Sequence, residues 1–597
     1  MSDVKRWRLE NANTQTERLL NGKGLLIFPR GLQITTVKIM SVRHFLCVSS
    51  LLLLIAMPVT SVLAQPAEPG PVQDGYPKNW GIDILHYAFA LQLSDTTDTI
   101  MGQATIEARY LAPGQSTLRL DLINQSESLR GNGMTVKRVL MDGRDLIFRH
   151  EDDQIFIELG REVMAHERIE VTVGYYGVPA TGLEIGLTKH GDRSFFSDNW
   201  SSRAKNWLPT VDHPYDKATN EFIITAPNHY QVISNGLLKE ETDLVDGMRL
   251  THWKNSVPIA TWLYVLGVAE FAVQYVDVFD GKSIQTWVYK QDRDAGFYDF
   301  AVPTKQSLAF FTDLVGPFSY EKLANIQSNS VGGGMEAASA IFYGDRSVTG
   351  TRDRRWQHVI VHEVAHQWFG NAVTEYEWND LWLSEGFATY YTLLFRAHAY
   401  GRDDFVVGLK NARDRVFAYY EDDYDFRIIR EHLPDLNNVS GSMIYQKAAW
   451  VLHMLRALVG EEAYNQGVRT YYAAYKDRNA STGDFRRHIE EASGMKLGWF
   501  FDQWLYQGGV VYLDGYWQYD EESNELEISL RQTQPTYTFR IAPVVDIVYD
   551  DGSKERLTLE LDGNLPMEHR SKVAKSVKEV IPDPDTELLA RWTFVQR

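Results

Sequence analysis

Hydrophobic and polar residues alternate along much of residues 75–272. The stretch TLRLDLIN places Leu118, Leu120 and Leu122 on one face of a strand, and the stretches GQATIEARYLA and RIEVTVGYYG show the same period of two. Clusters of Gly, Asp and Asn separate these runs, as turns between strands require. The pattern predicts a large antiparallel β domain.

Beyond about residue 300 the hydrophobic period becomes helical. The stretch RRWQHVIVHEVAHQWFG contains neither Pro nor Gly before Gly370, so we expect a helix that ends at this glycine. A second helix is predicted in SGSMIYQKAAWVLHMLRALVG, with Ser440 or Ser442 as its N-cap and Gly460 at its end. Residues 273–508 are therefore expected to form a mainly α domain.

Strands return after Gly509. The stretch NELEISLRQ alternates Leu526, Ile528 and Leu530, and Asp551-Gly552 is a hairpin signal inside VVDIVYDDGSKERLTLEL. We expect residues 509–597 to form a small β-sandwich. The order β, then mainly α, then β in a chain of 597 residues predicts a multidomain α+β protein.

The N-terminal region has the pattern of a secretory signal. An apolar run over residues 45–56 follows Arg43 and His44, and small residues lead to Ala64, where we expect cleavage. Because such signals stand at the start of a chain, Met40 is the expected start, and residues 1–39 an upstream extension. The alternative is an uncleaved membrane anchor formed by residues 45–64.

Export changes how the composition is interpreted. The only cysteine, Cys47, lies within the signal, so the mature chain would contain no thiol, which suits a bacterial periplasm or cell surface. Removal of residues 1–64 would shift the net charge from −19 to −24. Such an acidic chain is not expected to bind nucleic acid or anionic membranes. After cleavage of the signal, no stable membrane insertion is expected either.

Residues 358–391 carry the candidate chemistry. His362 and His366 are four residues apart, so on a helix both imidazoles can point at one metal ion. Zinc takes histidine nitrogens and a carboxylate oxygen, and Glu385, in a second predicted helix, is the natural third ligand. Glu363 points away from the ion but can reach a water beside it, which suits a general base.

The alternative is that both histidines make only local hydrogen bonds on an otherwise apolar helix. The apolar neighbours of His362 and His366 argue against it, because buried polar groups need a partner. His358 lies one turn before His362, about 6 Å along the helix axis. This is too far to share one tetrahedral ion with His366, so we expect a structural role for His358.

The motifs resemble those of one family. VHEVAHQWFGNAVTEYEWNDLWLSEGFATY resembles the zinc-binding segment of the aminopeptidase N family of gluzincin metallopeptidases. VGGGMEAASAIFY resembles its Gly-x-Met-Glu-Asn exopeptidase motif, and MIYQKAAWVLHML its Tyr-x-Lys-Gly helix. KNWLPTVDHPYDKATNEFIITAPNHYQVISNG resembles its N-terminal domain.

This resemblance implies a thermolysin-like catalytic domain that binds one Zn²⁺ through His362, His366 and Glu385. It implies that Glu363 is the acid/base and that Tyr445 donates a hydrogen bond to the oxyanion. The substrates implied are peptides with a free N-terminus. The residues implied to bind them are Glu336, which would hold the α-ammonium, and its neighbours Gly333, Gly334 and Met335.

Three positions depart from the family pattern: Ala337 and Ser384 replace asparagines, and Ala448 replaces a glycine. The resemblance implies a second amine-binding residue, Gln or Glu, in the N-terminal domain. Near that position Asp198 is the candidate, and the alternatives are Asn199 or no such residue. Asp380 could orient a ligand histidine, or it could be a helix-start carboxylate.

The sequence therefore predicts an exported zinc aminopeptidase. One alternative is an epoxide hydrolase with the same zinc site, which the β-like C-terminus argues against. The other is a scaffold without catalysis, which the presence of His362, Glu363, His366, Glu385 and Tyr445 argues against. The preferred N-terminal residue and the oligomeric state do not follow from the sequence.

Overall fold

The computed structural model describes residues 74–430, 433, 441, 443–563 and 565–597. The predicted signal, with Met40, Cys47 and Ala64, lies outside these residues, as do the predicted N-caps Ser440 and Ser442. Among the helices of the described part, none is both long and apolar enough to cross a membrane.

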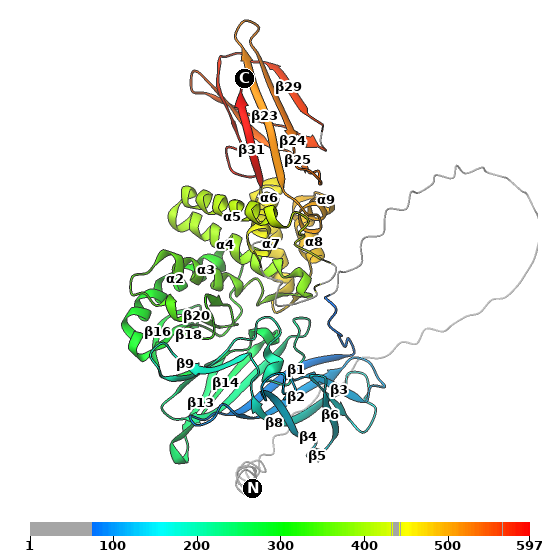
Figure 1. Ribbon diagram of the computed structural model, residues 1–597, viewed down its shortest axis with the longest axis vertical. Coiled ribbons are helices and arrows are strands. Elements are labelled where there is room, and N and C mark those ends of the chain that lie inside the picture. Colours follow the sequence, from blue (N-terminus) through cyan, green and yellow to red (C-terminus); the bar gives the residue numbers. More distant parts are fainter. Residues whose placement is uncertain (1–73, 431–432, 434–440, 442, 564) are drawn as a thin grey trace, which may run out of the picture. The chain divides into compact units, whose positions relative to one another are not determined.

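The first part of the fold is built from β-strands (Figure 1). An eight-stranded sheet has the order β13-β14-β11-β1-β2-β8-β4-β5. Its strands are β1 (Ile82–Gln92), β2 (Ile100–Tyr110), β4 (Gly133–Met141), β5 (Arg144–Asp145), β8 (Arg168–Val178), β11 (Ala218–Pro227), β13 (Leu237–Asp243) and β14 (Met248–Ile259). The pairs are antiparallel, as predicted, with the exception of β1 and β11, which run parallel.

Two smaller sheets complete this β part. One pairs β3 (Thr117–Asp121), β7 (Gln154–Glu158) and β6 (Ile147–Glu151), and the other pairs β12 (Gln231–Ser234), β15 (Leu266–Ala269), β10 (Arg193–Ser197) and β9 (Leu183–Leu187). Leu118, Leu120 and Leu122 are all fully buried, so the alternation in TLRLDLIN does mark the core face of a strand.

A five-stranded sheet opens the next part of the chain, in the order β16-β17-β18-β20-β19. Its strands are β16 (Phe271–Phe279), β17 (Lys282–Tyr289), β18 (Lys322–Ser328), β19 (Gly334–Met335) and β20 (Ala340–Gly344). The strands β17, β18, β19 and β20, and most of β16, fall within residues 273–508, which the sequence predicts to be mainly α. All seven residues of β18 are buried, so this strand shows none of the alternation by which a half-buried strand is found.

Helices form the rest of this part (Figure 1). They are α2 (Arg293–Leu314), α3 (Arg354–His366), α4 (Trp382–Tyr400), α5 (Arg402–Asp422), the π-helix η8 (Met443–Lys447), α6 (Ala448–Val459), α7 (Glu461–Tyr475), α8 (Thr482–Ser493), α9 (Gly498–Phe501) and the π-helix η9 (Asp502–Tyr506). Two short strands, β21 (Val373–Glu375) and β22 (Arg478–Ala480), pair in parallel beside them.

The predicted helix ends are partly correct. Gly460, with a φ of +85°, follows α6 as expected. The helix α3 ends at His366, four residues before the predicted Gly370. Gly370 has a φ of +104° and lies in the turn after the helix. A side chain there would collide with Ser384, so this glycine allows the turn to pack against α4.

Strands return at the C-terminal end, in a four-stranded sheet of the order β29-β24-β23-β31 and a three-stranded sheet of the order β27-β26-β30. Their bounds are β23 (Val511–Asp520), β24 (Glu525–Gln532), β26 (Val544–Tyr549), β27 (Lys554–Thr558), β29 (Met567–Lys572), β30 (Val577–Pro582) and β31 (Ala590–Gln596), with a short pair β25 (Arg540–Ile541) and β28 (Leu561–Asp562). The hairpin at Asp551-Gly552 joins β26 to β27, as predicted. The sandwich arrangement stays a prediction.

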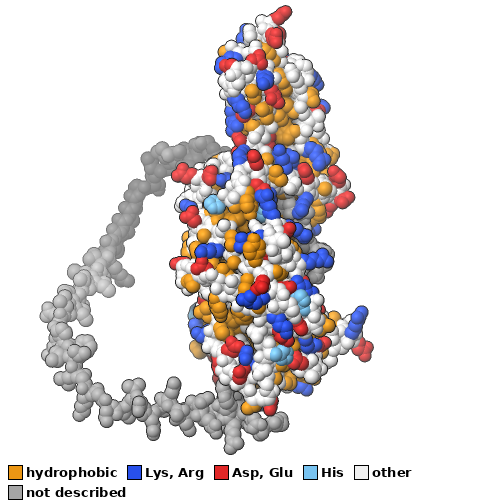
Figure 2. All heavy atoms as spheres, turned by 90° about the vertical axis from the view of Figure 1, so that its left-hand side faces the viewer, with side chains coloured by type: hydrophobic (Ala, Val, Ile, Leu, Met, Phe, Trp, Pro, Cys, Tyr) orange, Lys and Arg blue, Asp and Glu red, His pale blue; other side chains and the backbone are white. Residues whose placement is uncertain are grey.

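The described surface carries both signs of charge. On the face shown in Figure 2, acidic and basic side chains are interspersed, so the net negative charge is not gathered into one patch on this face.

Candidate metal centre

Three side chains from two neighbouring helices point at one spot. His362 and His366 come from α3, and Glu385 lies in the first turn of α4. The two Nε2 atoms of the histidines are 3.1 Å apart, and each lies 3.3 Å from Oε2 of Glu385. The three atoms therefore form a nearly equilateral triangle.

This triangle fits zinc. Ligand atoms at 2.0–2.1 Å from a tetrahedral ion lie about 3.3–3.4 Å from one another, close to the separations seen here. Oε2 of Glu385 is buried and accepts no hydrogen bond from the residues that the structure describes. A buried oxygen of this kind needs a partner, and a cation between the three side chains supplies one.

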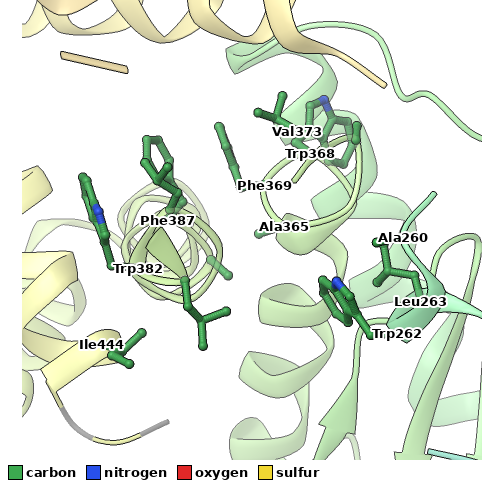
Figure 3. Packing of buried hydrophobic residues seen from close by; sticks show 14 of the residues in the cluster. Ala260, Trp262, Leu263, Ala365, Trp368, Phe369, Val373, Trp382, Phe387 and Ile444 are labelled. Atoms are coloured by element: carbon green, nitrogen blue, oxygen red, sulfur yellow. The ribbon is translucent and has the colours of Figure 1, made fainter. Parts of the chain in front are cut away.

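The two helices are held together by aromatic packing. Phe369, just after α3, stacks on Phe387 of α4 with their ring centroids 4.3 Å apart, and Figure 3 shows these rings side by side. The start of α3 is capped by Asp353, whose carboxylate accepts hydrogen bonds from the N–H groups of Arg355 and Trp356. The spacing of the histidines and the stack thus fix the ligand positions.

The proton of His366 is placed by its neighbours. Nδ1 of His366 lies 3.1 Å from the carbonyl oxygen of Phe369, which can only accept, so Nδ1 donates its proton there. Oγ of Ser384 lies 3.0 Å from the same nitrogen. Nε2 is then the nitrogen that faces the triangle, and it would bind a metal ion through its lone pair once its own proton has left.

Two more carboxylates lie beside the triangle. Ligating atoms of Glu336, Glu363 and His366 all lie within 4.8 Å of one another, and Oε1 of Glu336 is 4.0 Å from Nε2 of His366. Burial and the charge of Glu385 raise the pKa of Glu336 to about 7, against the attraction of His366. Burial and the charge of Glu336 raise the pKa of Glu363 well above its usual value.

The charges of the site are balanced by His366. Burial lowers the pKa of His366, but the charges of Glu336 and Glu385 outweigh burial and raise this pKa to about 10. Burial raises the pKa of Glu385, but His366 and His362 bring it below its usual range. A site that gathers this much negative charge around two imidazoles is suited to a cation.

Tyr445 also reaches this site. It lies in the π-helix η8, its hydroxyl donates to Oε1 of Glu385 over 2.6 Å, and its ring stacks on His362 at 6.0 Å between centroids. One oxygen of Glu385 thus faces the histidines, and the other accepts from Tyr445. Burial and the charge of Glu385 raise the pKa of Tyr445 well above 10, so its hydroxyl keeps its proton as a donor.

Two family models match the chain over more than half of its length. The peptidase family M1 domain matches residues 302–504, and the peptidase M1 N-terminal domain matches residues 84–263. The chain belongs to the M1 family, the family of aminopeptidase N. Family membership implies a catalytic zinc ion, and the triangle is the place where this M1 chain can hold it.

Relatives of the M1 chain are aminopeptidases. It is 29% identical over 404 residues to glutamyl aminopeptidase of Bos taurus, covering 65% of this chain and 41% of the relative. It is 26% identical over 436 residues to probable aminopeptidase 1 of Saccharolobus solfataricus, covering 69% and 52%. The chain thus spans about half the length of the curated relatives it matches.

A solved structure shares the fold. The M1 zinc metallopeptidase from Deinococcus radiodurans superposes with a TM-score of 0.61 at 24% identity, covering 71% of this chain and 93% of that chain. This similarity supports an M1 fold for the described part of the chain.

The glycines before Glu336 differ in their surroundings. A side chain on Gly334 would collide with the carboxylate of Glu363, so the backbone of β19 lies directly against Glu363. A side chain on Gly333 would meet open space. Met335 is buried and pairs with Phe342 of β20. Gly334 therefore leaves room for the predicted general base, and the binding of substrate by Gly333, Gly334 and Met335 stays a prediction.

Asp198 follows β10 and lies close enough to Glu336 for its charge to raise the pKa of Glu336. Its carboxylate is 2.6 Å from a guanidinium nitrogen of Arg203. The alternative, Asn199, is fully engaged in the core: its amide donates to the carbonyl of Tyr264 and accepts from the indole of Trp207. Of the two candidates, Asp198 is the one whose charge acts on Glu336.

Two further expectations can be compared with the structure. Asp380 accepts from the hydroxyl of Thr482 over 2.6 Å and from its N–H over 3.3 Å, so it holds the start of α8, and the described contacts of Asp380 include no ligand histidine. His358 lies outside the ligand triangle, 6.1 Å from the ring of Tyr400 between centroids.

Sequence reasoning missed two residues at the site. Gln367 and Asn371, just after the second histidine, are fully buried and both donate to the backbone carbonyl of Glu336. The available signal was two amides in an otherwise apolar stretch, HQWFGN, which need buried partners.

Proposed function

We propose that this chain is a zinc-dependent aminopeptidase, which hydrolyses N-terminal residues from peptides. The observation that carries the proposal is the placement of Glu336 and Glu363 beside the triangle of His362, His366 and Glu385. A hydrolase that trims N-termini needs three metal ligands, one proton acceptor and one anchor for an ammonium group. These five side chains supply each of them within one buried site.

Zinc, when bound, supplies Lewis acidity, which polarises a carbonyl and lowers the pKa of a bound water towards ~7. Glu363 is the proposed general base: it takes a proton from the attacking water and gives it to the leaving amine. Burial and the charge of Glu336 raise the pKa of Glu363, so its carboxylate holds a proton more tightly than an exposed carboxylate would, which favours the uptake of a proton from water.

Tyr445 is the proposed donor to the oxyanion that develops on the substrate carbonyl. A donor held in place before the reaction stabilises this charge most. The bond from its hydroxyl to Glu385 and its stack on His362 support this role, since both keep the hydroxyl beside the ligands.

Glu336 is the proposed anchor for the free α-ammonium of the substrate. Its Oε1 is buried and has no hydrogen-bond partner within the described part of the chain, which leaves it open to a cationic group. The charge of Asp198 acts on Glu336 as well, and Gly334, two residues before Glu336, lies against Glu363.

The first test is a mass-spectrometric time course with purified residues 65–597 and one mixed-sequence peptide, supplied free and N-acetylated. We expect stepwise loss of residues from the free peptide alone, and none with Glu363→Gln. Cleavage of both peptides at internal bonds would replace the aminopeptidase with an endopeptidase. No cleavage of either, with zinc bound, would favour a non-peptidase.

We also propose that the protein is exported, on the basis of the apolar run over residues 45–56 and the small residues before Ala64. N-terminal sequencing of the protein recovered from a bacterial periplasm should begin at Gln65. Recovery in the membrane fraction with residues 45–64 intact would support the anchored alternative.

A further inference from the structure

The backbone of the amine anchor is held by the zinc-binding segment itself. The carbonyl oxygen of Glu336 accepts two hydrogen bonds, 2.9 Å from Nε2 of Gln367 and 2.6 Å from Nδ2 of Asn371. A carbonyl oxygen has two lone pairs, so these two amides fill its capacity. All three residues are buried.

The side chain of Gln367 makes a second hydrogen bond to the same turn. Its Oε1 accepts from the N–H of Ser339 over 3.0 Å, while its Nε2 donates to Glu336. One side chain therefore spans the turn over residues 336–339 at both ends. Ser339 has a φ of +65°, a conformation that costs a non-glycine residue energy, so the turn needs outside contacts to keep its shape.

The contact links the turn to the metal ligands because of where Gln367 lies in the sequence. It is the residue directly after the ligand His366, and Asn371 follows in the turn that ends at β21. A displacement of α3 is thereby passed to the backbone of Glu336 through two buried amides. The separation between the metal ligands and the ammonium anchor is set by side chains of one short segment.

We infer that Gln367 and Asn371 are positioning residues that set the distance from the metal to the Glu336 carboxylate, and thereby the selection of a free N-terminus. This inference rests on the proposed role of Glu336. Neither amide is assigned to touch the substrate. Loss of either donor should let the Glu336 turn shift, which weakens ammonium binding while the ligand triangle remains.

The test measures binding rather than turnover, in a Glu363→Gln background loaded with zinc. Calorimetry gives the Kd of one tripeptide in its free and N-acetylated forms, and the ratio of the two reports amine selection. Gln367→Met keeps the size of the side chain and removes its hydrogen bonds to the carbonyl of Glu336, to the N–H of Ser339 and to the carbonyl of Glu363, which is 3.4 Å away. Asn371→Leu keeps the branched shape and removes the hydrogen bond of Asn371 to the carbonyl of Glu336 without touching Glu363, and it also serves if the first variant folds poorly.

The matched control is Gln327→Met. Gln327 is also fully buried, but it lies on β18 and bonds to Asp292 and to the N–H of Tyr289. We expect the preference for the free peptide to fall about tenfold in Gln367→Met and Asn371→Leu, as misplacement of a binding group predicts. The control should keep the preference, and all three should bind one zinc per chain.

Each other outcome overturns the inference. An unchanged preference in both variants would show that the amides do not position Glu336. Equal weakening of both peptides, or loss of zinc, would assign Gln367 and Asn371 to the metal site instead. If Glu363→Gln alone shows no preference for the free peptide, the role of Glu336 fails, whereas zinc-dependent hydrolysis can still be established by the time course.

Discussion

At the scale of single residues, the hydroxyl of Tyr445 has a proposed catalytic role that is separate from the packing of its ring. Tyr445→Phe should keep the stack on His362 and lose the hydrogen bond to Glu385. We expect kcat to fall by about 10²–10³, the usual effect of removing one oxyanion donor. Steady-state kinetics with a zinc assay would show this, with KM and zinc content nearly unchanged.

The control for this prediction is Tyr320→Phe. Tyr320 is fully buried, and its hydroxyl has no hydrogen-bond partner among the described residues, so its removal should leave kcat as it is. A Tyr445→Phe variant with the kcat of the control would remove Tyr445 from the mechanism.

The side-chain amine of Lys322 is buried next to the Glu336 turn. Its Nζ donates to the carbonyl of Ser234 over 2.7 Å and to the hydroxyl of Ser339 over 3.3 Å, and burial lowers its pKa to about 7. Between this value and the usual pKa of 10.5, the unfolded chain binds more protons at this site than the folded one. The contribution of Lys322 to stability therefore rises with pH in this window.

The prediction compares wild type with Lys322→Met. The free energy of unfolding of the wild type should rise relative to that of Lys322→Met by about 1 kcal/mol per pH unit between pH ~7.5 and ~9.5. Denaturant titrations at several pH values measure it. Parallel pH dependence of the two proteins would mean that Lys322 is not a neutral amine in the fold.

The residue scale also shows what sequence could predict. His362, His366 and Glu385 follow from spacing and ligand chemistry, and the structure does bring their atoms together. Tyr445 could be chosen among 31 tyrosines only through family resemblance, because it lies in a π-helix that has no hydrophobic period of its own. Gln367 and Asn371 depend on a long-range turn that no local pattern reveals.

At the scale of elements, α4 and the start of α6 meet at small residues. A side chain on Gly386, next to Glu385, would place its Cβ 2.6 Å from Cβ of Ala448. Ala448 stands where the resembled family has glycine. At this contact α4, which carries Glu385, packs directly against α6, which follows Tyr445. The two helices are so close that a larger side chain at either position would push them apart.

We predict that Gly386→Ala pushes α4 away from η8 and α6, and so moves Glu385 relative to Tyr445. Zinc affinity and kcat/KM should each fall about tenfold or more. The double variant Gly386→Ala/Ala448→Gly restores the space and should recover most of the loss. Failure of the second change to rescue the first would place the cause elsewhere.

Elements differed in how far their sequence revealed them. Leu526, Ile528 and Leu530 alternate and are all buried, so β24 was predicted directly. The strands β18 and β20 are buried along their whole length and pair in parallel, so they lack a polar face to mark them. The end of α3 was predicted four residues late, because no Pro or Gly stands between His366 and Gly370 to mark an earlier end.

At the scale of the whole molecule, the first described residues are bound far along the chain. Asp74 lies 2.6 Å from Nε2 of His213 and 3.0 Å from the ammonium of Lys78, which also lies 2.8 Å from Glu377. The N–H of Trp378 donates to Asp74 over 3.0 Å. These buried charges join residues 74–78, His213 and residues 377–378, which are far apart in the sequence. Trp378 lies four residues before the start of α4, the helix that carries the third ligand.

Lys78→Met should destabilise this network strongly. It removes the cation between two buried carboxylates, and breaking a buried pair in this way costs about 3–5 kcal/mol. We expect a lower thermal midpoint and faster proteolysis near residue 74. The control, Lys496→Met, changes a lysine whose side chain is 95% exposed and should alter neither. A midpoint equal to that of the control would contradict the prediction.

The same network can be completed only late in synthesis, because its members are far apart in the sequence. Lys78 and Glu377 are separated by 299 residues, and Asp74 and Trp378 by 304. At roughly 5–20 residues per second, a ribosome needs about 15–60 seconds to make the chain between them. For that interval Asp74 can pair only with Lys78 and His213, while the contacts of Lys78 with Glu377 and of Asp74 with Trp378 are missing. The segment around Asp74 therefore cannot reach its final state before residues 377 and 378 are made. A nascent chain stalled before residue 377 should therefore be cut readily near its beginning, and one stalled well after 378 should resist.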